Sequence, residues 1–437
     1  MTFKFSLGLM ALMALVGCSR QDPTLEGLRE TLDGSAAQQD AARFVAEGAV
    51  AFAAPKQVKN ASWTHQGGNP QHNAGHLVLN TNITQIWASS VGSGDDRRHQ
   101  ITASPVVSNG RVFTLDSRAT VTATSTTGQP IWSMDLTNAL DSPDDASGGG
   151  LAVAKGRVFV TTGFGTVSAL DVETGALIWT QDLVGFGGAA PTIYKDLLYI
   201  ASRDGSGWAI NVNDGTIAWQ IAGPEGLATL TGGPGVAVSN KWAIFPFGSG
   251  EVYSTFRRGG LRNWTSVLSG ARLGQAITSI GDLTGDPVIA GNRVYLSNAS
   301  GRTAALDLQS GDRVWTANQG TKGDIWVAGN SVFAVSDLNH LMRLDANDGE
   351  LVWSVPLPRY TTDKVRRRKT VVAHFGPILA GGRLVVMSSD GIMRQYDPND
   401  GSQISETEMA RPAASAPIVA DGTLYVMDTS GNLVAFR

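Results

Sequence analysis

The chain has a single cysteine, Cys18, among its 437 residues. This excludes a disulfide within the chain and a zinc site built from several cysteines. Charge is also scarce: 34 Lys and Arg stand against 38 Asp and Glu, so the net charge is −4. Without a basic excess to neutralise phosphates, the nucleic-acid-binding class is excluded. Beyond the first twenty residues there is no apolar run of the roughly 20 residues that a membrane-spanning helix needs.

The N-terminus has the proportions of a secretory signal. Lys4 gives a short positive start, and Ser6–Val16 is an apolar stretch too short to span a bilayer. Leu15-Val16-Gly17-Cys18 resembles the lipobox of bacterial lipoproteins, in which the thiol is lipidated and cleavage leaves the cysteine first. We therefore predict a signal peptide over 1–17 and a lipid on Cys18; the alternative is an ordinary signal peptide with an incidental cysteine. In Gram-negative lipoproteins Ser19 at the next position implies passage to the outer membrane.

Residues 18–60 differ from the rest of the chain. They contain Ala-rich and acidic stretches such as Gly34–Ala42 and show little strand patterning. We expect a flexible spacer between the lipid and a folded domain.

From Trp63 onward the chain repeats itself. Glycine makes up 52 of the 437 residues, which is above the typical share of about 7%. The frame is A-x-D-x-x-x-G-x-x-x-W, as in Ala169–Trp179 and again in Ala305–Trp315. Less complete copies recur at other positions, and at Asp397/Gly401 a serine, Ser405, replaces the tryptophan. Before each copy stand two apolar runs separated by a turn. Each unit therefore predicts four antiparallel strands in roughly 40–50 residues, the size of a propeller blade.

The physical roles in this frame can be assigned. Asn109-Gly110 suits a two-residue hairpin turn. The Asp accepts hydrogen bonds from its own turn, the Gly adopts a left-handed conformation, and the Trp lies on the outermost strand, where it packs on the next unit. Inner strands begin near eight positions, namely Pro105, Leu151, Pro191, Pro234, Pro287, Ile325, Pro377 and Pro417.

These eight starts predict an all-β, eight-bladed propeller over 61–437, with seven blades as the alternative. The last unit stops at Arg437 without an outer strand, and Ile83–Ser89 supplies a spare one. We expect this N-terminal strand to complete the last blade, because closure removes open sheet edges.

Few residues suggest chemistry. His65, His72 and His76 share a Gly- and Pro-containing loop without a fixed carboxylate, so we expect no metal there. No nucleophile elbow, phosphate loop or HExxH motif occurs. One basic run stands out in the link 356–375; it is either a solvated loop or a contact for anionic lipid or an acidic partner. Its cations are Lys364, Arg366, Arg367, Arg368 and Lys369.

The repeat frame resembles the tryptophan-docking repeats of pyrroloquinoline-quinone propellers. With the lipobox, the ring length and the segment Ile86–Gly94, the chain resembles the BamB family of outer-membrane protein assembly lipoproteins. The resemblance implies an eight-bladed periplasmic propeller without cofactor or catalysis. It also implies a monomer within a hetero-complex that binds the POTRA domains of BamA and aids β-barrel insertion.

The resemblance also implies a partner surface on two loops, after the third blade and before the fifth. In this sequence they are Ala222–Gly233 and Ser269–Gly285, and the partner-binding candidates are Leu227, Leu230, Arg272 and Asp282. Leu230 and Asp282 match the family pattern, whereas Ala228, Thr231 and Thr284 depart from it. Because both loops flank the fourth blade, we expect them to be neighbours on one face.

Two other classes stay open. A pyrroloquinoline-quinone-dependent dehydrogenase is the enzymatic alternative, but many such enzymes carry a vicinal disulfide that one cysteine cannot form. No calcium ligands or catalytic aspartate can be assigned either. The second alternative is a propeller that binds envelope sugars or peptidoglycan. Affinity, the other complex members and the dependent barrel proteins cannot be read from the sequence.

Overall fold

The computed structural model describes residues 43–183, 188–202, 204–224, 233–270, 283–362, 364, 366, 368 and 370–437. Residues 42–437 form one compact unit, which we call the ring. The predicted signal peptide over 1–17 and Cys18 lie outside the described residues. Within the described part, no helix has the length and apolarity needed to cross a bilayer.

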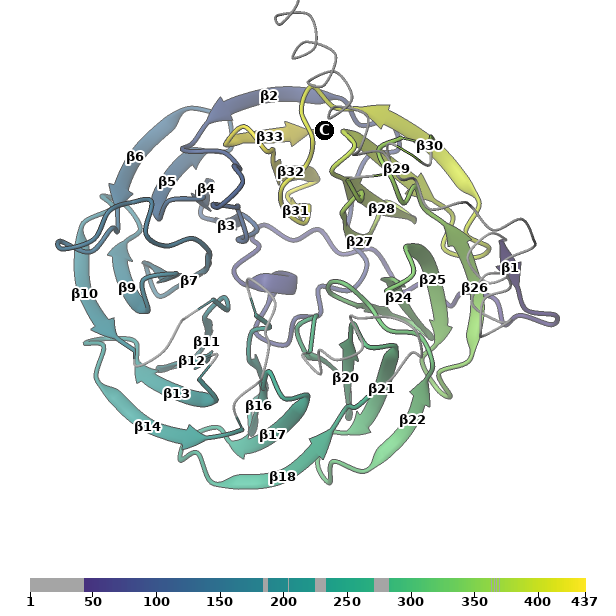
Figure 1. Ribbon diagram of the computed structural model, residues 1–437, viewed down its shortest axis with the longest axis horizontal. Helices are drawn as coiled ribbons and strands as arrows, with labels where there is room; N and C mark the ends of the chain where they lie inside the picture. Colours follow the sequence, from purple (N-terminus) through teal and green to yellow (C-terminus); the bar gives the residue numbers. More distant parts are fainter. Residues whose placement is uncertain are drawn as a thin grey trace, which may run out of the picture. The chain divides into compact units, whose positions relative to one another are not determined.

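The ring consists of eight antiparallel sheets arranged as the blades of a propeller (Figure 1). This confirms the predicted eight-bladed fold and excludes seven blades. The first four blades hold β3 (Val106–Ser108), β4 (Arg111–Leu115), β5 (Thr120–Ser125) and β6 (Pro130–Asp135); β7 (Gly149–Ala154), β8 (Arg157–Thr162), β9 (Thr166–Asp171) and β10 (Leu177–Asp182); β11 (Thr192–Tyr194), β12 (Leu197–Ala201), β13 (Ser206–Asn211) and β14 (Ile217–Ala222); β15 (Ala237–Val238), β16 (Trp242–Pro246), β17 (Glu251–Phe256) and β18 (Arg262–Val267). The last four hold β19 (Val288–Ala290), β20 (Arg293–Asn298), β21 (Arg302–Asp307) and β22 (Arg313–Ala317); β23 (Trp326–Ala328), β24 (Ser331–Val335), β25 (His340–Asp345) and β26 (Leu351–Pro356); β27 (His374–Ala380), β28 (Arg383–Ser388), β29 (Ile392–Tyr396) and β30 (Gln403–Glu408); β31 (Ile418–Ala420), β32 (Thr423–Met427), β33 (Asn432–Phe436) and β2 (Gln85–Ser90).

The hydrophobic core lies between the blades. The second and third strands of a blade are buried on both faces, which explains their continuous apolar runs, whereas the outermost strands alternate between exposed and partly buried residues. One buried cluster joins blades 1 and 2, and another joins blades 4 and 5. Each blade is therefore stabilised mainly by its neighbours.

The repeat tryptophan docks onto the next blade. In blade 4, Trp264 lies against Gly311 of blade 5, so closely that a Cβ there would be 2.6 Å from the ring. Its Nε1 donates to the Leu308 carbonyl at 3.1 Å. The same glycine contact recurs for Trp87, Trp132, Trp179, Trp219, Trp264, Trp315 and Trp353. The predicted packing of each Trp on the next unit is confirmed.

Ser405 takes the place of the docking tryptophan at the seam between blades 7 and 8, where no frame glycine faces it. It lies on β30, the outer strand of blade 7, and the next blade is blade 8. In blade 8 the outer strand β2 comes from the N-terminal part of the chain, so no turn links it to β33. A tryptophan at 405 would therefore find no frame glycine to contact.

The N-terminal strand closes the last blade. β2 pairs antiparallel with β33, with Gln85 opposite Phe436 and Ser90 opposite Asn432. Thr84 and Arg437 exchange two backbone hydrogen bonds just beyond this ladder. The predicted closure by Ile83–Ser89 is confirmed.

Of the predicted spacer over 18–60, residues 18–42 lie outside the described residues, and residues 43–60 differ from the prediction because they lie on the ring. β1 (Phe44–Val45) pairs with the outer strand β26 and makes blade 6 five-stranded. Phe52 packs edge-on against Phe333 at 5.3 Å. These contacts could not be predicted from the sequence, because a short strand that pairs with the edge of a distant sheet leaves no local hydrophobic pattern.

Residues 58–78, which we call the clasp, form a closed loop across one end of the central channel and include the short 3-10 helix η1 (Gln66–Gly68) (Figure 1). The clasp makes a hydrogen bond to every blade in turn. Its acceptor groups receive hydrogen bonds from Asp421, Val107, Val153, Ile193, Val238, Ile289, Trp326 and Gly382, in blades 8 and 1 to 7 respectively. The clasp thus pairs polar groups that the innermost strands would otherwise leave buried without partners.

Candidate functional site

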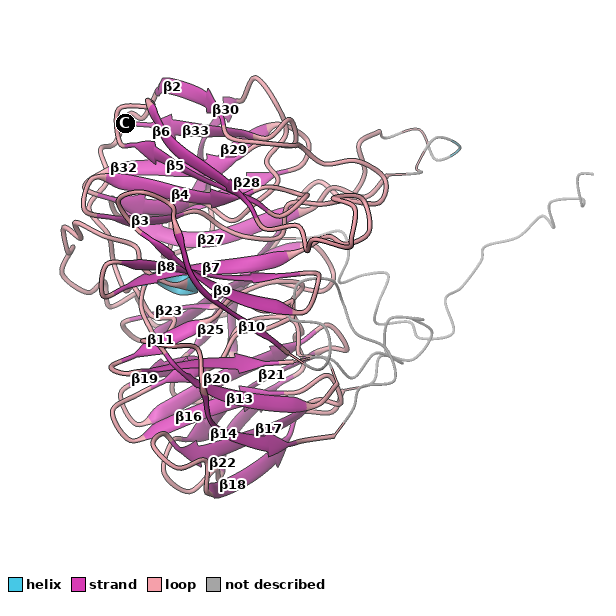
Figure 2. Ribbon diagram, turned by 90° about the vertical axis from the view of Figure 1, so that its left-hand side faces the viewer, coloured by secondary structure: helices cyan, strands magenta, loops and turns pink. Residues whose placement is uncertain are grey.

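The two ends of the channel are built differently. The clasp covers the end that carries the turns between first and second strands, such as Asn109-Gly110, where both residues have positive φ as predicted. The opposite end, which we call the mouth, is surrounded by the links between blades. These links are the longer ones, and Figure 2 shows loops projecting from that face. The mouth is therefore the face on which the fold allows the most variation.

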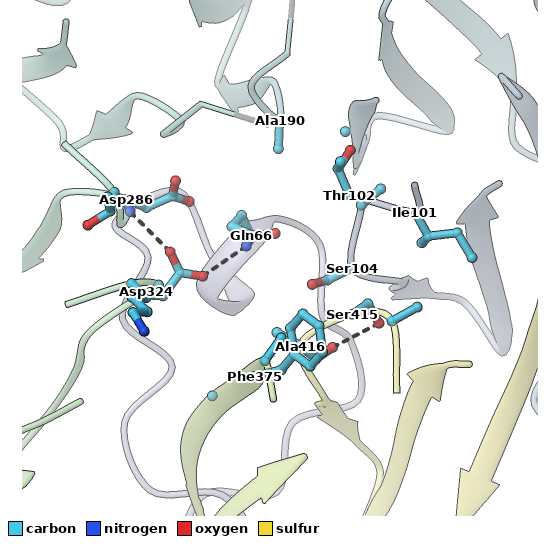
Figure 3. Close-up of a pocket in the computed structure, with 18 of the residues that line it drawn as sticks. Gln66, Ile101, Thr102, Ser104, Ala190, Asp286, Asp324, Phe375, Ser415 and Ala416 are labelled. Atoms are coloured by element: carbon cyan, nitrogen blue, oxygen red, sulfur yellow. Dashed lines mark hydrogen bonds between the residues drawn. The ribbon is translucent and has the colours of Figure 1, made fainter. Parts of the chain in front are cut away.

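A cavity of about 490 Å³ occupies the channel on the mouth side. Its walls are mostly small and apolar residues from the starts of the first strands, such as Gly150. Ala190 and Ala416 are two of them in Figure 3. A much smaller space of about 30 Å³ lies next to the clasp, enough for one water molecule. Gln66, Ser104, Asp286 and Asp324 line both spaces.

Two carboxyl groups mark the boundary between these spaces. Asp324 accepts hydrogen bonds from the Gln66 amide at 2.9 Å and from the Asp286 backbone N–H at 3.1 Å (Figure 3). One oxygen of Asp286 accepts from the Gly235 N–H at 2.7 Å, while its Oδ2 is buried and has no hydrogen bond. Burial raises the pKa of Asp286 to about 6, and burial together with the nearby Asp286 raises the pKa of Asp324 to about 6.

The three candidate histidines have structural partners. His65 Nε2 accepts a hydrogen bond from the Ile193 N–H, and His76 Nε2 accepts one from the Gly382 N–H. The Nδ1 atom of His72 lies 3.0 Å from the Pro287 carbonyl oxygen and 3.6 Å from Asp286 Oδ2. Burial lowers the pKa of His65 to about 3 and that of His72 to about 4. Among the described residues no three His, Cys, Asp or Glu side chains converge as metal ligands.

The four predicted partner-binding residues, Leu227, Leu230, Arg272 and Asp282, lie outside the described residues. The ends of their loops are described. Gly233 closes the first loop, Leu283 follows the second candidate Asp282, and both line the cavity at the mouth. Both loops join an outer strand to the next inner strand on either side of blade 4, which is the topology that we expected for neighbours on one face. The role of the four side chains stays a prediction.

The basic run is also attached to the mouth face. Val371 to Phe375, which follow it, line the cavity. Of its cations, Lys364, Arg366 and Arg368 are described and exposed, whereas Arg367 and Lys369 are not described. The Arg368 guanidinium lies 5.1 Å from the Tyr360 ring, a cation–π contact within the link.

Sequence reasoning missed Asp286 and Asp324. A signal was present, since each follows a glycine and directly precedes an inner strand in two consecutive blades, as Gly285-Asp286-Pro287 and Gly323-Asp324-Ile325. Ser and Asp are common at turns of this ring, which concealed two carboxyls that face the channel instead.

Comparisons with known proteins identify the family. A family model described as outer membrane protein assembly factor BamB matches residues 117–355 and 359–437. The chain belongs to the BamB family. The BamB proteins of Yersinia pestis and Escherichia coli K12 are 27% and 25% identical to it. The alignments cover 81% and 80% of this chain and 88% of each relative.

Solved structures agree on the fold. The crystal structure of BamB from Moraxella catarrhalis superposes with a TM-score of 0.67 at 17% identity, over 82% of this chain and all of that one. A quinohemoprotein alcohol dehydrogenase from Comamonas testosteroni gives the same TM-score at 15% identity, over 87% of this chain and 81% of that one. At these identities the likeness concerns the propeller alone.

Proposed function

We propose that this chain is an assembly factor for outer membrane β-barrel proteins that works as a non-catalytic scaffold in the periplasm. The observation that carries the proposal is its membership of the BamB family across most of the ring. The architecture suits a scaffold, because a closed ring holds its mouth loops on a rigid frame. As part of this proposal the mouth face binds POTRA domains of BamA.

The binding experiment uses purified BamA periplasmic domains from the same organism and the double variant Leu230→Ala/Asp282→Ala. In the proposal Leu230 is an apolar anchor and Asp282 orients the partner. Loss of a buried anchor typically costs about 2 kcal/mol or more, or roughly thirtyfold in affinity. A matched control is Ile178→Ala/Asp182→Ala, since both are exposed residues on the outer strand of blade 2. Equal affinity of the first variant and the wild type, with unchanged melting temperatures, would place the interface elsewhere.

The proposed attachment is a lipid on Cys18, which would hold the ring at the outer membrane. The Cys18→Ala protein should move from the detergent phase to the aqueous phase in a phase-separation experiment. If the wild-type and Cys18→Ala proteins partition equally, the lipid anchor is wrong.

The non-catalytic part of the proposal has a ligand test. Pyrroloquinoline quinone and calcium should leave the melting temperature unchanged, because only a ligand of the folded state raises it. A rise that depends on quinone concentration would favour the dehydrogenase alternative.

A further inference from the structure

The outer turn of blade 4 departs from the repeat frame in charge. In blade 2 the corresponding turn begins with Asp171, whose carboxylate accepts the N–H groups of Glu173 and Thr174. In blade 4 the turn reads Phe256-Arg257-Arg258-Gly259-Gly260-Leu261. The position that is an aspartate in blades 2, 5, 6 and 7 is therefore Phe256 here, and two cations follow it.

Turns from blades 2, 3 and 4 bring further cations to this place. The Arg257 N–H donates to the Lys241 carbonyl at 2.9 Å, and its guanidinium lies 5.0 Å from the Tyr194 ring. Lys195 Nζ donates to Asn240 Oδ1 at 3.3 Å, which links the two inner turns. We call this set the basic corner; it consists of Lys155, Lys195, Lys241, Arg257 and Arg258.

The corner has little compensating charge. Asp196 lies among these cations and is paired with Lys155. Lys195, Lys241 and Arg258 are exposed, and Arg257 is buried behind them. Lys195, Lys241 and Arg258 therefore make a local positive surface on a chain whose net charge is −4.

Apolar side chains are exposed at the same place. Leu261, in the turn, is 70% exposed, and Phe256 is 36% exposed. The Phe256 ring packs on Trp242 with centroids 4.7 Å apart, and Lys241 Nζ lies 4.3 Å from the Trp242 centroid. The aromatic pair therefore supports a projecting turn whose tip is apolar and whose surroundings are cationic.

We propose that the basic corner binds an anionic phospholipid surface, with Leu261 and Phe256 entering the interface between headgroups and acyl chains. Cations around exposed apolar side chains are the chemistry of peripheral membrane attachment. A turn at the rim of a ring is convex, so it can meet a flat bilayer, and this contact needs no lipid on Cys18.

The corner and the basic run of the mouth link cannot serve the same flat surface. The corner consists of turns on the clasp face at blades 2 to 4, whereas the run joins blades 6 and 7 on the mouth face. The corner also carries the exposed leucine and phenylalanine. The observations therefore favour the clasp face at blades 2 to 4 as the side that contacts lipid.

The experiment is co-sedimentation of the ring, residues 42–437, with vesicles of phosphatidylglycerol and phosphatidylethanolamine. The ring has its own core and its own closing strand, so it is used without the preceding residues. We expect binding that weakens with salt and is lost on phosphatidylcholine vesicles. The variant Lys195→Ser/Lys241→Ser/Arg258→Ser should bind about a hundredfold more weakly, at about fivefold per cation. Leu261→Ser alone should lose about fivefold.

The matched control removes three exposed cations from the basic run, as Lys364→Ser/Arg366→Ser/Arg368→Ser. It should retain vesicle binding. A fluorophore on Leu261→Cys, the one thiol in this ring, should shift to the blue on anionic vesicles. Three results would overturn the proposal. The first is that the corner variant binds vesicles as well as the wild type, and the second is that only the control variant loses vesicle binding. The third is that the corner variant loses binding to the BamA domains but keeps vesicle binding, which would assign the corner to a protein partner.

Discussion

The two ends of the channel differ in role: the clasp ties the blades together at one end, and the long links stand around the other. At the clasp end, one segment hydrogen-bonds to all eight blades and buries Trp63, His65 and His72. At the mouth end, the inner strands begin around an open cavity of about 490 Å³, and the long links stand around it. Because the clasp already ties the blades together at one end, the long links at the other end are free to vary and to carry recognition.

The largest expected effect is at the clasp. Trp63 is buried and stacks on Trp326 of blade 6 with centroids 6.2 Å apart. Trp63→Ala should cost about 3–5 kcal/mol of unfolding free energy, because the cavity cannot collapse inside a closed ring. Chemical denaturation measures the loss, and Val371→Ala at the mouth, where the side chain is half exposed, is the control. Equal losses in the two variants would remove the contrast between the ends.

The second effect is a pH dependence of stability that has opposite signs for Asp286, which lines the cavity, and for His65, which lies in the clasp. Burial raises the pKa of Asp286 to about 6, so above pH 6 the buried carboxylate destabilises the folded state by on the order of 2–3 kcal/mol. This destabilisation is relieved as the pH falls from 6 towards 3.8. Burial lowers the pKa of His65 to about 3, so the neutral ring is tolerated in the folded state above pH 6.5. The free energy of unfolding then decreases as the pH falls below 6.5, because only the unfolded state binds the proton readily.

Melting temperatures from pH 7.5 to 4.5 check both signs. As the pH falls, the wild type should gain stability relative to Asp286→Asn and lose its advantage over His65→Gln. Parallel curves for the two variants would contradict the assigned protonation states.

A smaller effect is expected from one hydrogen bond of the clasp. His76→Ala leaves the Gly382 N–H without its acceptor, so we expect a loss of about 1–2 kcal/mol. His374 at the mouth also makes two hydrogen bonds, to Ser388 and to the Pro358 carbonyl, but it is only partly buried. His374→Ala should therefore cost less in the same denaturation experiment. The reverse order would show that the mouth links stabilise the ring.

The smallest effect concerns the seam between blades 7 and 8. The clasp bridges this seam through Leu77 and Asn60, and no tryptophan docks across it. Ser405→Trp should change stability by less than about 0.5 kcal/mol, as for an ordinary surface position. A gain comparable to the burial of a tryptophan would mean that blade 8 offers a receptor after all.

Much of the ring could be predicted from sequence because its contacts are local and repeated. The Asp, Gly and Trp of Ala169–Trp179 recur with the same roles, and the eight starts of inner strands gave the number of blades. The clasp could not be predicted, since His65 and His76 pair with backbone groups far along the chain and their Gly- and Pro-containing segment has no period. Asp286 and Asp324 were hidden among turn residues of the same type. The partner residues, such as Leu230, need a bound partner to be located.

The closing strand has a consequence for the order of events during synthesis. β2 is made before the first blade, but its partner β33 is made after every other strand of the ring, and Arg437 pairs with Thr84 just beyond this ladder. Until β33 is made, β2 and the first seven blades form an open arc with exposed strand edges. The time between the first and last blades is therefore the interval in which this protein is most exposed to aggregation and to proteases. Loss of only the last strand would leave the molecule in that state permanently.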